Sequence, residues 1–156
     1  MTRTAVVIIA SSRAAAGVYP DRTGPLIETW LTERGFTVTG PLVVADGPDV
    51  GAALQEAIGA DLVLTSGGTG IAPTDSTPEE TAPLLDVQIP GLAAAIRAEG
   101  SDAVPTAVLS RGLAGVAGHT LVINLPGSTG GVRDGLAALD RVLDHALDQI
   151  RGGDHR

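Results

Sequence analysis

Runs of apolar residues alternate along this chain with segments whose apolar residues recur every three to four positions. Residues 4–10 form a continuous, largely β-branched apolar run, which is typical of a strand buried on both faces of a parallel sheet. Over 22–35 the spacing is helical, and Gly35 fits the end of that helix. The same pattern predicts a strand over 36–44, a helix over 50–58 and a strand over 61–65. Such alternation indicates a doubly wound α/β fold.

The second half of the chain continues the alternation less regularly. Thr77, Pro78 and Glu80 match a capping box that starts a short helix, and Pro90 opens another helix that runs to about Gly100. Strands are expected over 104–109 and 120–124, and one long helix is expected to follow them and to end near Ile150. We therefore expect a single domain over 1–151, with three layers (α/β/α) around a mostly parallel sheet, and a frayed tail over 152–156.

Composition narrows the class of protein. The chain has 156 residues, of which 44% are hydrophobic but only 2% aromatic, so the core must be built from Ala, Val, Leu and Ile. No apolar run reaches the about 18–20 residues that a membrane span needs, and the N-terminal run is too short for a secretory signal. We expect a cytoplasmic protein with no membrane partner.

Missing residue types exclude several kinds of chemistry. Cysteine is absent, which excludes disulfides, thiolate catalysis, iron–sulfur clusters and zinc sites with sulfur ligands. All 10 cationic residues are arginine, so neither a Schiff-base lysine nor a P-loop lysine exists. The net charge of -8 argues against a nucleic-acid partner. An anionic substrate would have to be met by backbone amides, a few arginines or a metal ion.

Polar and glycine-rich segments follow three of the predicted strands. Asp46 follows the second, Ser66-Gly-Gly-Thr-Gly70 and then Asp75 follow the third, and Asn124-Leu-Pro-Gly-Ser128 follows the last. Ligands bind at the carboxyl ends of strands in open parallel sheets. Glycines let successive N–H groups converge on an anion, so both glycine-rich loops are candidates to hold phosphate. The alternative for each loop is a plain turn, although the stretch 66–76 is longer than a turn needs.

Two aspartates at this edge suggest a metal. Asp46 and Asp75, each taken alone, fit an ordinary solvated loop residue. Beside a polyphosphate they suit Mg²⁺, which takes one or two carboxylates and fills its other positions with water and phosphate oxygens. Asp49 and Asp21 are alternatives to either, and Ser110 is a candidate phosphate donor. The dinucleotide fingerprint fits poorly, because Pro73 stands where a third small residue belongs.

Five motifs in a fixed order resemble the MogA/MoaB family of molybdenum cofactor biosynthesis proteins, including the G domains of gephyrin and its plant counterpart. They are Ser66-Gly-Gly-Thr-Gly70, Asp75-Ser-Thr-Pro-Glu79, Pro90-Gly-Leu92, Leu109-Ser-Arg111 and Ile123-Asn-Leu-Pro-Gly127. Ser12, Arg13 and the stretch 17–22 extend the resemblance, which covers about residues 4–150.

The resemblance implies an α/β fold, a homotrimer, and transfer of AMP from ATP to molybdopterin with Mg²⁺ and release of pyrophosphate. It also implies hand-over to a separate protein that inserts molybdate. Asp46 and Asp75 match the family's essential acidic pair. The positions that match its ligand-contacting loops are Ser66, Gly67, Gly68, Thr69, Gly70, Ser110, Asn124, Pro126, Gly127 and Ser128.

This chain departs from the family pattern at two positions. Thr74 stands where many members have Arg, and Ser12 stands where many have Asp. The alternatives to an adenylyltransferase are a non-catalytic protein that binds or carries molybdopterin and, less well supported by the glycine pattern, a nicotinamide-dependent oxidoreductase.

Overall fold

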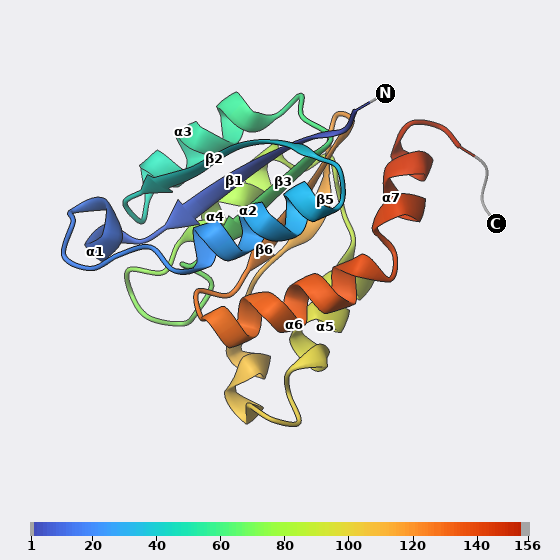
Figure 1. Cartoon of the computed structure of the whole chain (residues 1–156). Coiled ribbons are helices and arrows are strands. Elements are labelled where there is room, and N and C mark those ends of the chain that lie inside the picture. Colours follow the sequence, from blue (N-terminus) through green and yellow to red (C-terminus); the bar gives the residue numbers. More distant parts are fainter. Residues whose placement is uncertain (1, 154–156) are drawn as a thin grey trace.

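A six-stranded, mostly parallel sheet forms the centre of the protein (Figure 1). The computed structural model describes residues 2–153. The strand order is β2-β1-β3-β6-β5-β4. Strands β1, β2, β3 and β6 run parallel, and β5 pairs antiparallel with both β6 and β4. The strands are β1 (Thr4–Ala10), β2 (Thr37–Val44), β3 (Leu62–Ser66), β4 (Val87–Gln88), β5 (Ala114–Ala117) and β6 (Thr120–Leu125). The predicted α/β class and the predominantly parallel sheet are confirmed.

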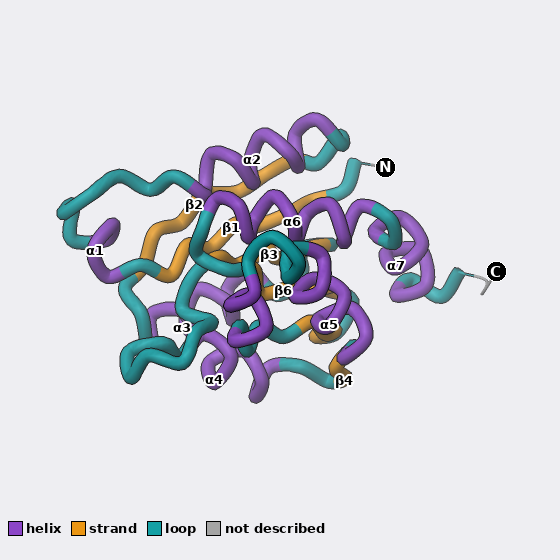
Figure 2. The backbone as a smooth tube through the Cα atoms, turned by 90° about the horizontal axis from the view of Figure 1, so that it is seen from below, coloured by secondary structure: helices purple, strands orange, loops and turns teal. Residues whose placement is uncertain are grey.

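Helices cover both faces of the sheet, and Figure 2 shows α2 and α3 on opposite sides of the strands. The α-helices are α1 (Ser12–Ala15), α2 (Thr23–Glu33), α3 (Pro48–Ala57), α4 (Thr77–Thr81), α5 (Pro90–Glu99), α6 (Thr129–Asp140) and α7 (Leu143–Ile150). Two short 3₁₀ helices are η1 (Ala82–Leu84) and η2 (Pro105–Leu109). No helix among residues 2–153 is long and apolar enough to cross a membrane.

Alternate side chains of the central strands enter two separate hydrophobic clusters. Val7 of β1 packs in the larger cluster with side chains of α2, α5, α6 and α7, whereas its neighbour Ile8 packs in the smaller cluster with Val50 and Leu54 of α3. Both Val7 and Ile8 are fully buried. Because each face of the strand is covered, an uninterrupted apolar run is the expected sequence for β1.

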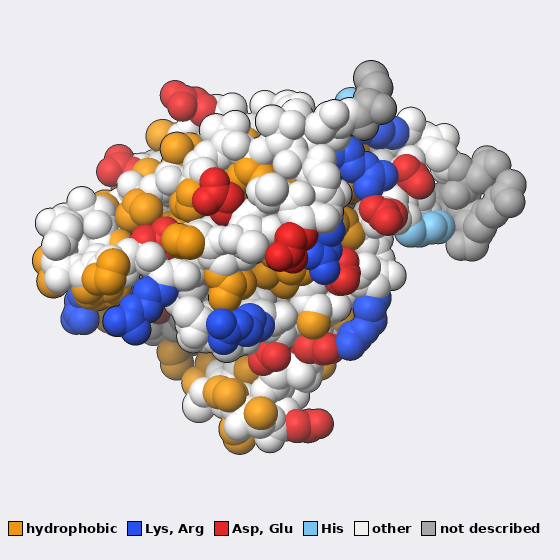
Figure 3. All heavy atoms as spheres, in the orientation of Figure 1, with side chains coloured by type: hydrophobic (Ala, Val, Ile, Leu, Met, Phe, Trp, Pro, Cys, Tyr) orange, Lys and Arg blue, Asp and Glu red, His pale blue; other side chains and the backbone are white. Residues whose placement is uncertain are grey.

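The expected strand at 104–109 is wrong, because this segment forms η2 and joins no sheet. Pro105 lacks the N–H that a strand would donate, and it stands in the first turn of the 3₁₀ helix. Val104, Val108 and Leu109 are 52%, 68% and 47% exposed. The η2 segment projects at the bottom of Figure 1, and Figure 3 shows hydrophobic side chains on the same projection.

Two other details of the helices differ from expectation. The long last helix is divided into α6 and α7, which meet at Arg141 and Val142. The capping box at Thr77 is also wrong, because Ser76 is the residue that precedes α4. Among the residues that the structure describes, no side chain caps this helix, and the buried Thr77 hydroxyl has no hydrogen-bond partner. The sequence did not indicate α1, β4 or β5.

The carboxyl ends of the four parallel strands meet at one edge of the sheet, where α1 and the glycine-rich loops lie (Figure 1). Gly67 shows how close these loops are. Its N–H donates to the carbonyl of Leu125 at 3.1 Å, and a Cβ at Gly67 would lie 2.3 Å from the carbonyl oxygen of Ala10. Gly67 also has a φ of +96°. Only glycine fits this junction between three strands.

Candidate functional site

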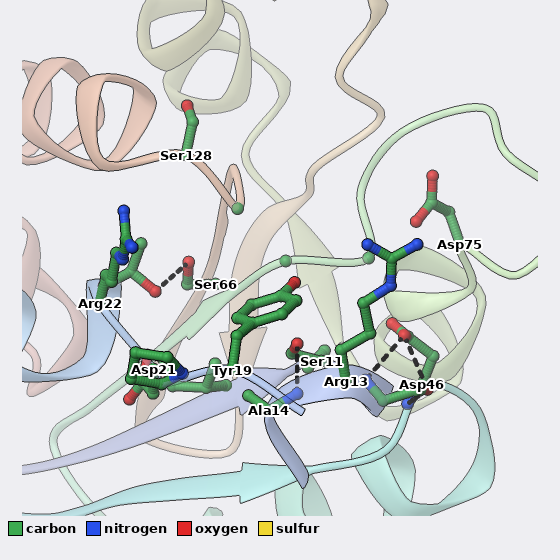
Figure 4. A pocket seen from close by; sticks show the side chains of 18 of the residues that line it. Ser11, Arg13, Ala14, Tyr19, Asp21, Arg22, Asp46, Ser66, Asp75 and Ser128 are labelled. Atoms are coloured by element: carbon green, nitrogen blue, oxygen red, sulfur yellow. Dashed lines mark hydrogen bonds between the residues drawn. The ribbon is translucent and has the colours of Figure 1, made fainter. Parts of the chain in front are cut away.

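A cavity of about 670 Å³ opens at this edge of the sheet (Figure 4). Its walls come from the loops that follow all four parallel strands and comprise residues 9–14, 19–23, 46, 66–68, 74–75 and 127–129. Asp46 and Asp75 both line it, although 28 residues lie between them in the chain. The structure therefore brings the two aspartates of the expected acidic pair to one cavity.

A second cavity of about 680 Å³ adjoins the first. The two share Gly68, Asp75, Gly127 and Ser128 in their walls. The second cavity extends toward α5, η2 and the beginning of α6, where its wall is mainly apolar. The glycine-rich loop after β3 and the loop after β6 thus form a common rim between two compartments.

Asp46 is held by the loop that follows β1. The N–H and the hydroxyl of Ser12 donate to Oδ2 of Asp46 at 3.3 and 3.1 Å, and the N–H of Asp46 contacts the same hydroxyl at 3.1 Å. Oδ1 lies 3.1 Å from the position that a Cβ at Gly68 would take. Ser12, which stands at a position where the family resemblance leads us to expect Asp, therefore fixes one oxygen of Asp46 and adds no second negative charge.

Asp75 is held within its own loop. Its Oδ2 accepts from the N–H of Ala72 at 3.1 Å, and its N–H donates to the carbonyl of Ala72 at 2.9 Å. Among residues 2–153 no hydrogen bond involves Oδ1 of Asp46 or Oδ1 of Asp75. Each carboxylate keeps one oxygen for a ligand.

This donor set fits a magnesium ion that is bound together with a phosphate. Within the described part of the chain, no three His, Asp or Glu side chains gather as a complete metal site. Mg²⁺ ordinarily takes one or two carboxylates and completes its octahedron with water and substrate phosphates. Asp46 and Asp75 supply hard oxygen ligands of the right kind and number for that mode of binding.

Backbone N–H groups of the glycine-rich loop are available as anion donors. Over residues 2–153, the amides of Gly68, Thr69, Gly70 and Ile71 donate to no protein acceptor. Gly68 has a φ of +69°, which turns the chain at the rim of both cavities. Opposite, Ser128 begins α6, and its Oγ accepts from the N–H of Gly131 at 3.0 Å. Unpaired amides and a helix N-terminus attract phosphate groups.

Arginines and a tyrosine from the loop after β1 complete the first cavity. Arg13, Tyr19 and Arg22 line it, and Figure 4 shows the Arg13 side chain extending toward Asp75. In the described part of the chain, neither Arg13 nor Arg22 forms an ion pair. Free guanidinium groups suit an anionic ligand. The rule that ligands bind at strand ends, applied to the first strand as well, would have found these three residues in the sequence.

Most of the remaining expected site residues line one or both cavities. Gly67 lines the first cavity, Thr69, Gly70, Ser110 and Pro126 line the second, and Gly68, Gly127 and Ser128 line both. Ser66 lines the first cavity, but its buried hydroxyl donates to the carbonyl of Pro126 at 2.7 Å. Ser66 therefore ties β3 to the loop after β6.

Asn124 lines neither cavity. It is 3% exposed, and its Nδ2 donates to the hydroxyls of Thr65 and Thr81 at 3.0 and 3.2 Å. Its Oδ1 accepts from the N–H of Leu113 at 3.0 Å. These bonds join β6 to β3, α4 and the segment before β5, so the structure gives Asn124 a place in the framework behind the rim.

Known proteins match both the sequence and the structure. The chain is 60% identical to the structure of the molybdopterin biosynthesis Mog protein from Mycobacterium ulcerans, with a TM-score of 0.93 over 97% of this chain and 99% of that one. It is 37% identical to a molybdopterin adenylyltransferase from Helicobacter pylori, over 94% of this chain and 86% of the relative. A molybdenum cofactor biosynthesis bifunctional protein from Synechococcus elongatus is 42% identical over 97% of this chain.

The chain spans only about half the length of the Synechococcus protein, namely 48%. Residues 6–145 match the family described as "Probable molybdopterin binding domain". This match covers most of the chain, and the solved relative covers nearly all of it. The chain belongs to this molybdopterin-binding family, and within it to the MogA/MoaB proteins.

Proposed function

We propose that the protein acts in molybdenum cofactor biosynthesis as a molybdopterin adenylyltransferase. In this reaction the terminal phosphate of molybdopterin receives AMP from ATP, and pyrophosphate is released. The family match and the relatives that carry this name support the proposal. The resemblance also leads us to propose a homotrimer and hand-over of the product to a molybdate-inserting protein.

One observation carries the proposal. Within residues 2–153, two carboxylates with a free oxygen each, a row of amides without a protein acceptor and two arginines without an ion pair meet around two adjoining cavities. Both substrates of the proposed reaction are anionic, and they must approach each other closely. The rim shared by the two cavities supplies hydrogen-bonding groups at the place where two such substrates can meet, and Arg13 and Arg22 supply positive charge in the first cavity.

The proposed reaction requires little general acid–base catalysis from side chains. A phosphate monoester has a second pKa near ~6, so at neutral pH the molybdopterin phosphate is already largely a dianion. One of its oxygens forms a bond to the α-phosphorus of ATP while the bond from that phosphorus to pyrophosphate breaks. No proton has to be removed from the attacking oxygen.

The protein contributes alignment and neutralisation of charge. The amides of the glycine-rich loop and the guanidinium groups of Arg13 and Arg22 would hold phosphate oxygens in place and oppose their charge. Asp46 and Asp75 would hold Mg²⁺. Bound with ATP, this ion supplies positive charge against the phosphate oxygens.

The test is release of pyrophosphate from ATP by the purified protein. We expect release that requires both molybdopterin and Mg²⁺. The competing function is a carrier that binds molybdopterin without catalysis. Binding of molybdopterin that is independent of ATP and Mg²⁺, with no pyrophosphate formed, would favour the carrier.

A further inference from the structure

The side chain of Arg111 is hydrogen-bonded to the glycine-rich loop and to the segment that follows it. Arg111 follows η2 and uses all three guanidinium nitrogens. Nε donates to the carbonyl of Gly70 at 2.8 Å, Nη2 donates to the carbonyl of Asp75 at 3.1 Å, and Nη1 pairs with Oε2 of Glu79 at 2.6 Å. The backbone N–H of Arg111 adds a bond to the carbonyl of Thr69 at 2.8 Å. One residue thus holds both ends of the loop that carries Asp75.

These contacts fix the direction of three peptide groups. The peptide bonds after Thr69, Gly70 and Asp75 are trans, since the only cis bond within residues 2–153 is Gly40–Pro41. In a trans peptide the N–H points opposite to the C=O. With the three carbonyls turned to Arg111, the N–H groups of Gly70, Ile71 and Ser76 face away from it.

The loop lies between Arg111 and the two cavities. Gly70 and Asp75 line the second cavity, whereas Arg111 lines neither of the two. In the described part of the chain, the N–H groups of Gly70, Ile71 and Ser76 donate to no protein acceptor. Arg111 therefore occupies the carbonyl side of the loop and leaves its amide side open.

We propose that Arg111 is a positioning residue, which keeps the amides and the carboxylate of the loop in place for the reacting phosphates without touching them. The proposal rests on the proposed function of the site. Arginine suits the task because its planar group donates in three directions at once, which the single ammonium of lysine cannot reproduce with the same geometry.

Stability alone does not account for this residue. The Arg111 and Glu79 side chains are 36% and 59% exposed, and ion pairs this accessible to water contribute little to folding. The loop itself buries few apolar side chains, and Ile71 is 69% exposed. Loss of the three contacts is therefore expected to loosen the loop more than it destabilises the domain.

The experiment compares four variants with the wild type in steady-state assays of pyrophosphate release and in amide hydrogen exchange. Arg111→Met removes all three donors and keeps the apolar stem, and Arg111→Lys keeps the charge. Glu79→Gln weakens only the ion pair. Arg34→Met is the matched control, because Arg34 also uses all three nitrogens, on Asp140 and the carbonyl of Trp30, far from both cavities.

We expect Arg111→Met to lower kcat about tenfold or more and to change the KM for ATP less than about threefold, because misalignment acts mainly on the transition state. Arg111→Lys should recover only part of the loss, and Glu79→Gln should lose less than either. The amides of Ala72 and Asp75, which are bonded inside the loop, should exchange faster in Arg111→Met. Arg34→Met should change neither kcat nor the exchange of these amides.

The two proposals fail in different ways. If the wild type releases no pyrophosphate, the proposed function is wrong, and the exchange of the Ala72 and Asp75 amides alone decides the role of Arg111. If the wild type is active but Arg111→Met keeps both its kcat and slow exchange in the loop, the positioning role is overturned. Equal losses in Arg111→Met and Arg34→Met would also overturn it, because they would reflect stability alone.

Discussion

Asp46 and Asp75 are held by different neighbours, yet each offers one carboxylate oxygen to the same cavity. We expect Asp46→Asn and Asp75→Asn each to lower kcat/KM by about 10²-fold or more, the loss associated with one preorganised electrostatic group. Steady-state pyrophosphate release measures this. Asp49→Asn is the control, because Asp49 lies in the first turn of α3 and lines neither cavity. Near-normal turnover in both site variants would contradict a metal site formed by Asp46 and Asp75.

Substitution of Gly68 tests whether the glycine-rich loop depends on the left-handed backbone conformation of this residue. A Cβ there would lie 2.3 Å from Oγ1 of Thr77 and 3.1 Å from Oδ1 of Asp46, at a φ of +69°. Gly118 also has a left-handed φ, of +61°, but nothing lies within 4 Å of its Cβ position.

Gly118→Ala should therefore show only the conformational penalty of about 1–2 kcal/mol. Gly68→Ala should lose more stability and should also bind ATP more weakly, because its side chain displaces Asp46 or Thr77. Thermal unfolding and calorimetric titration with ATP and Mg²⁺ measure the two effects. Equal behaviour of the two variants would show that the close approach at Gly68 is unimportant.

From their positions after predicted strands, the site residues could be located in the sequence, but their hydrogen bonds could not be predicted. Residues after β2, β3 and β6 were expected at one edge, and the structure places Asp46, Asp75 and Ser128 at one cavity. Whether a given side chain faces that cavity depends on hydrogen bonds from distant segments. The side-chain amide of Asn124 is hydrogen-bonded to Thr65, Thr81 and Leu113, and nothing in the local sequence indicates these bonds.

At the scale of elements, the buried strands were predictable and the edge of the sheet was not. Strands β1, β3 and β6 are covered on both faces, and their largely apolar sequences indicate this burial. β4 has only two residues, both exposed, and β5 is a short run of small residues. The apolar stretch that became η2 resembles a strand in composition, but it packs against neither face of the sheet. Hydrophobicity alone cannot distinguish these cases.

Asp61 joins three elements at the opposite edge of the sheet. This buried carboxylate precedes β3, accepts from the N–H of Thr4 in β1 at 2.8 Å and pairs with Arg151 after α7. Burial acts to raise the pKa of Asp61, but the hydrogen bonds from Thr4 and Arg151 outweigh it and hold the pKa below its ordinary value.

A lowered pKa means that Asp61 stabilises the fold above the ordinary Asp pKa of about 3.9 and loses that contribution as the pH falls through the pKa of the folded state. Asp61→Asn should lower the free energy of unfolding by about 1–3 kcal/mol at neutral pH. The difference from the wild type should shrink below pH ~4. Urea unfolding across pH measures it, with exposed Asp102 as the site of a control Asn substitution. A difference independent of pH would contradict the role of the charge.

At the scale of the whole molecule, the parallel topology gathers the candidate site. The loops after β1, β2, β3 and β6 reach one rim only because these strands point the same way. Strands β5 and β4 continue the sheet beyond β6, and their residues line neither of the two cavities. The fold thus places residues from positions 9 to 129 around one space.

The most direct measurement follows the α-phosphate of ATP. The protein would be incubated with molybdopterin, Mg²⁺ and ATP labelled at the α-phosphorus, and the pterin product separated from nucleotide. We expect the label to move to the pterin in an amount equal to the pyrophosphate released, and we expect omission of Mg²⁺ to stop both. Bound molybdopterin that stays unlabelled while ATP remains intact would contradict adenylyl transfer.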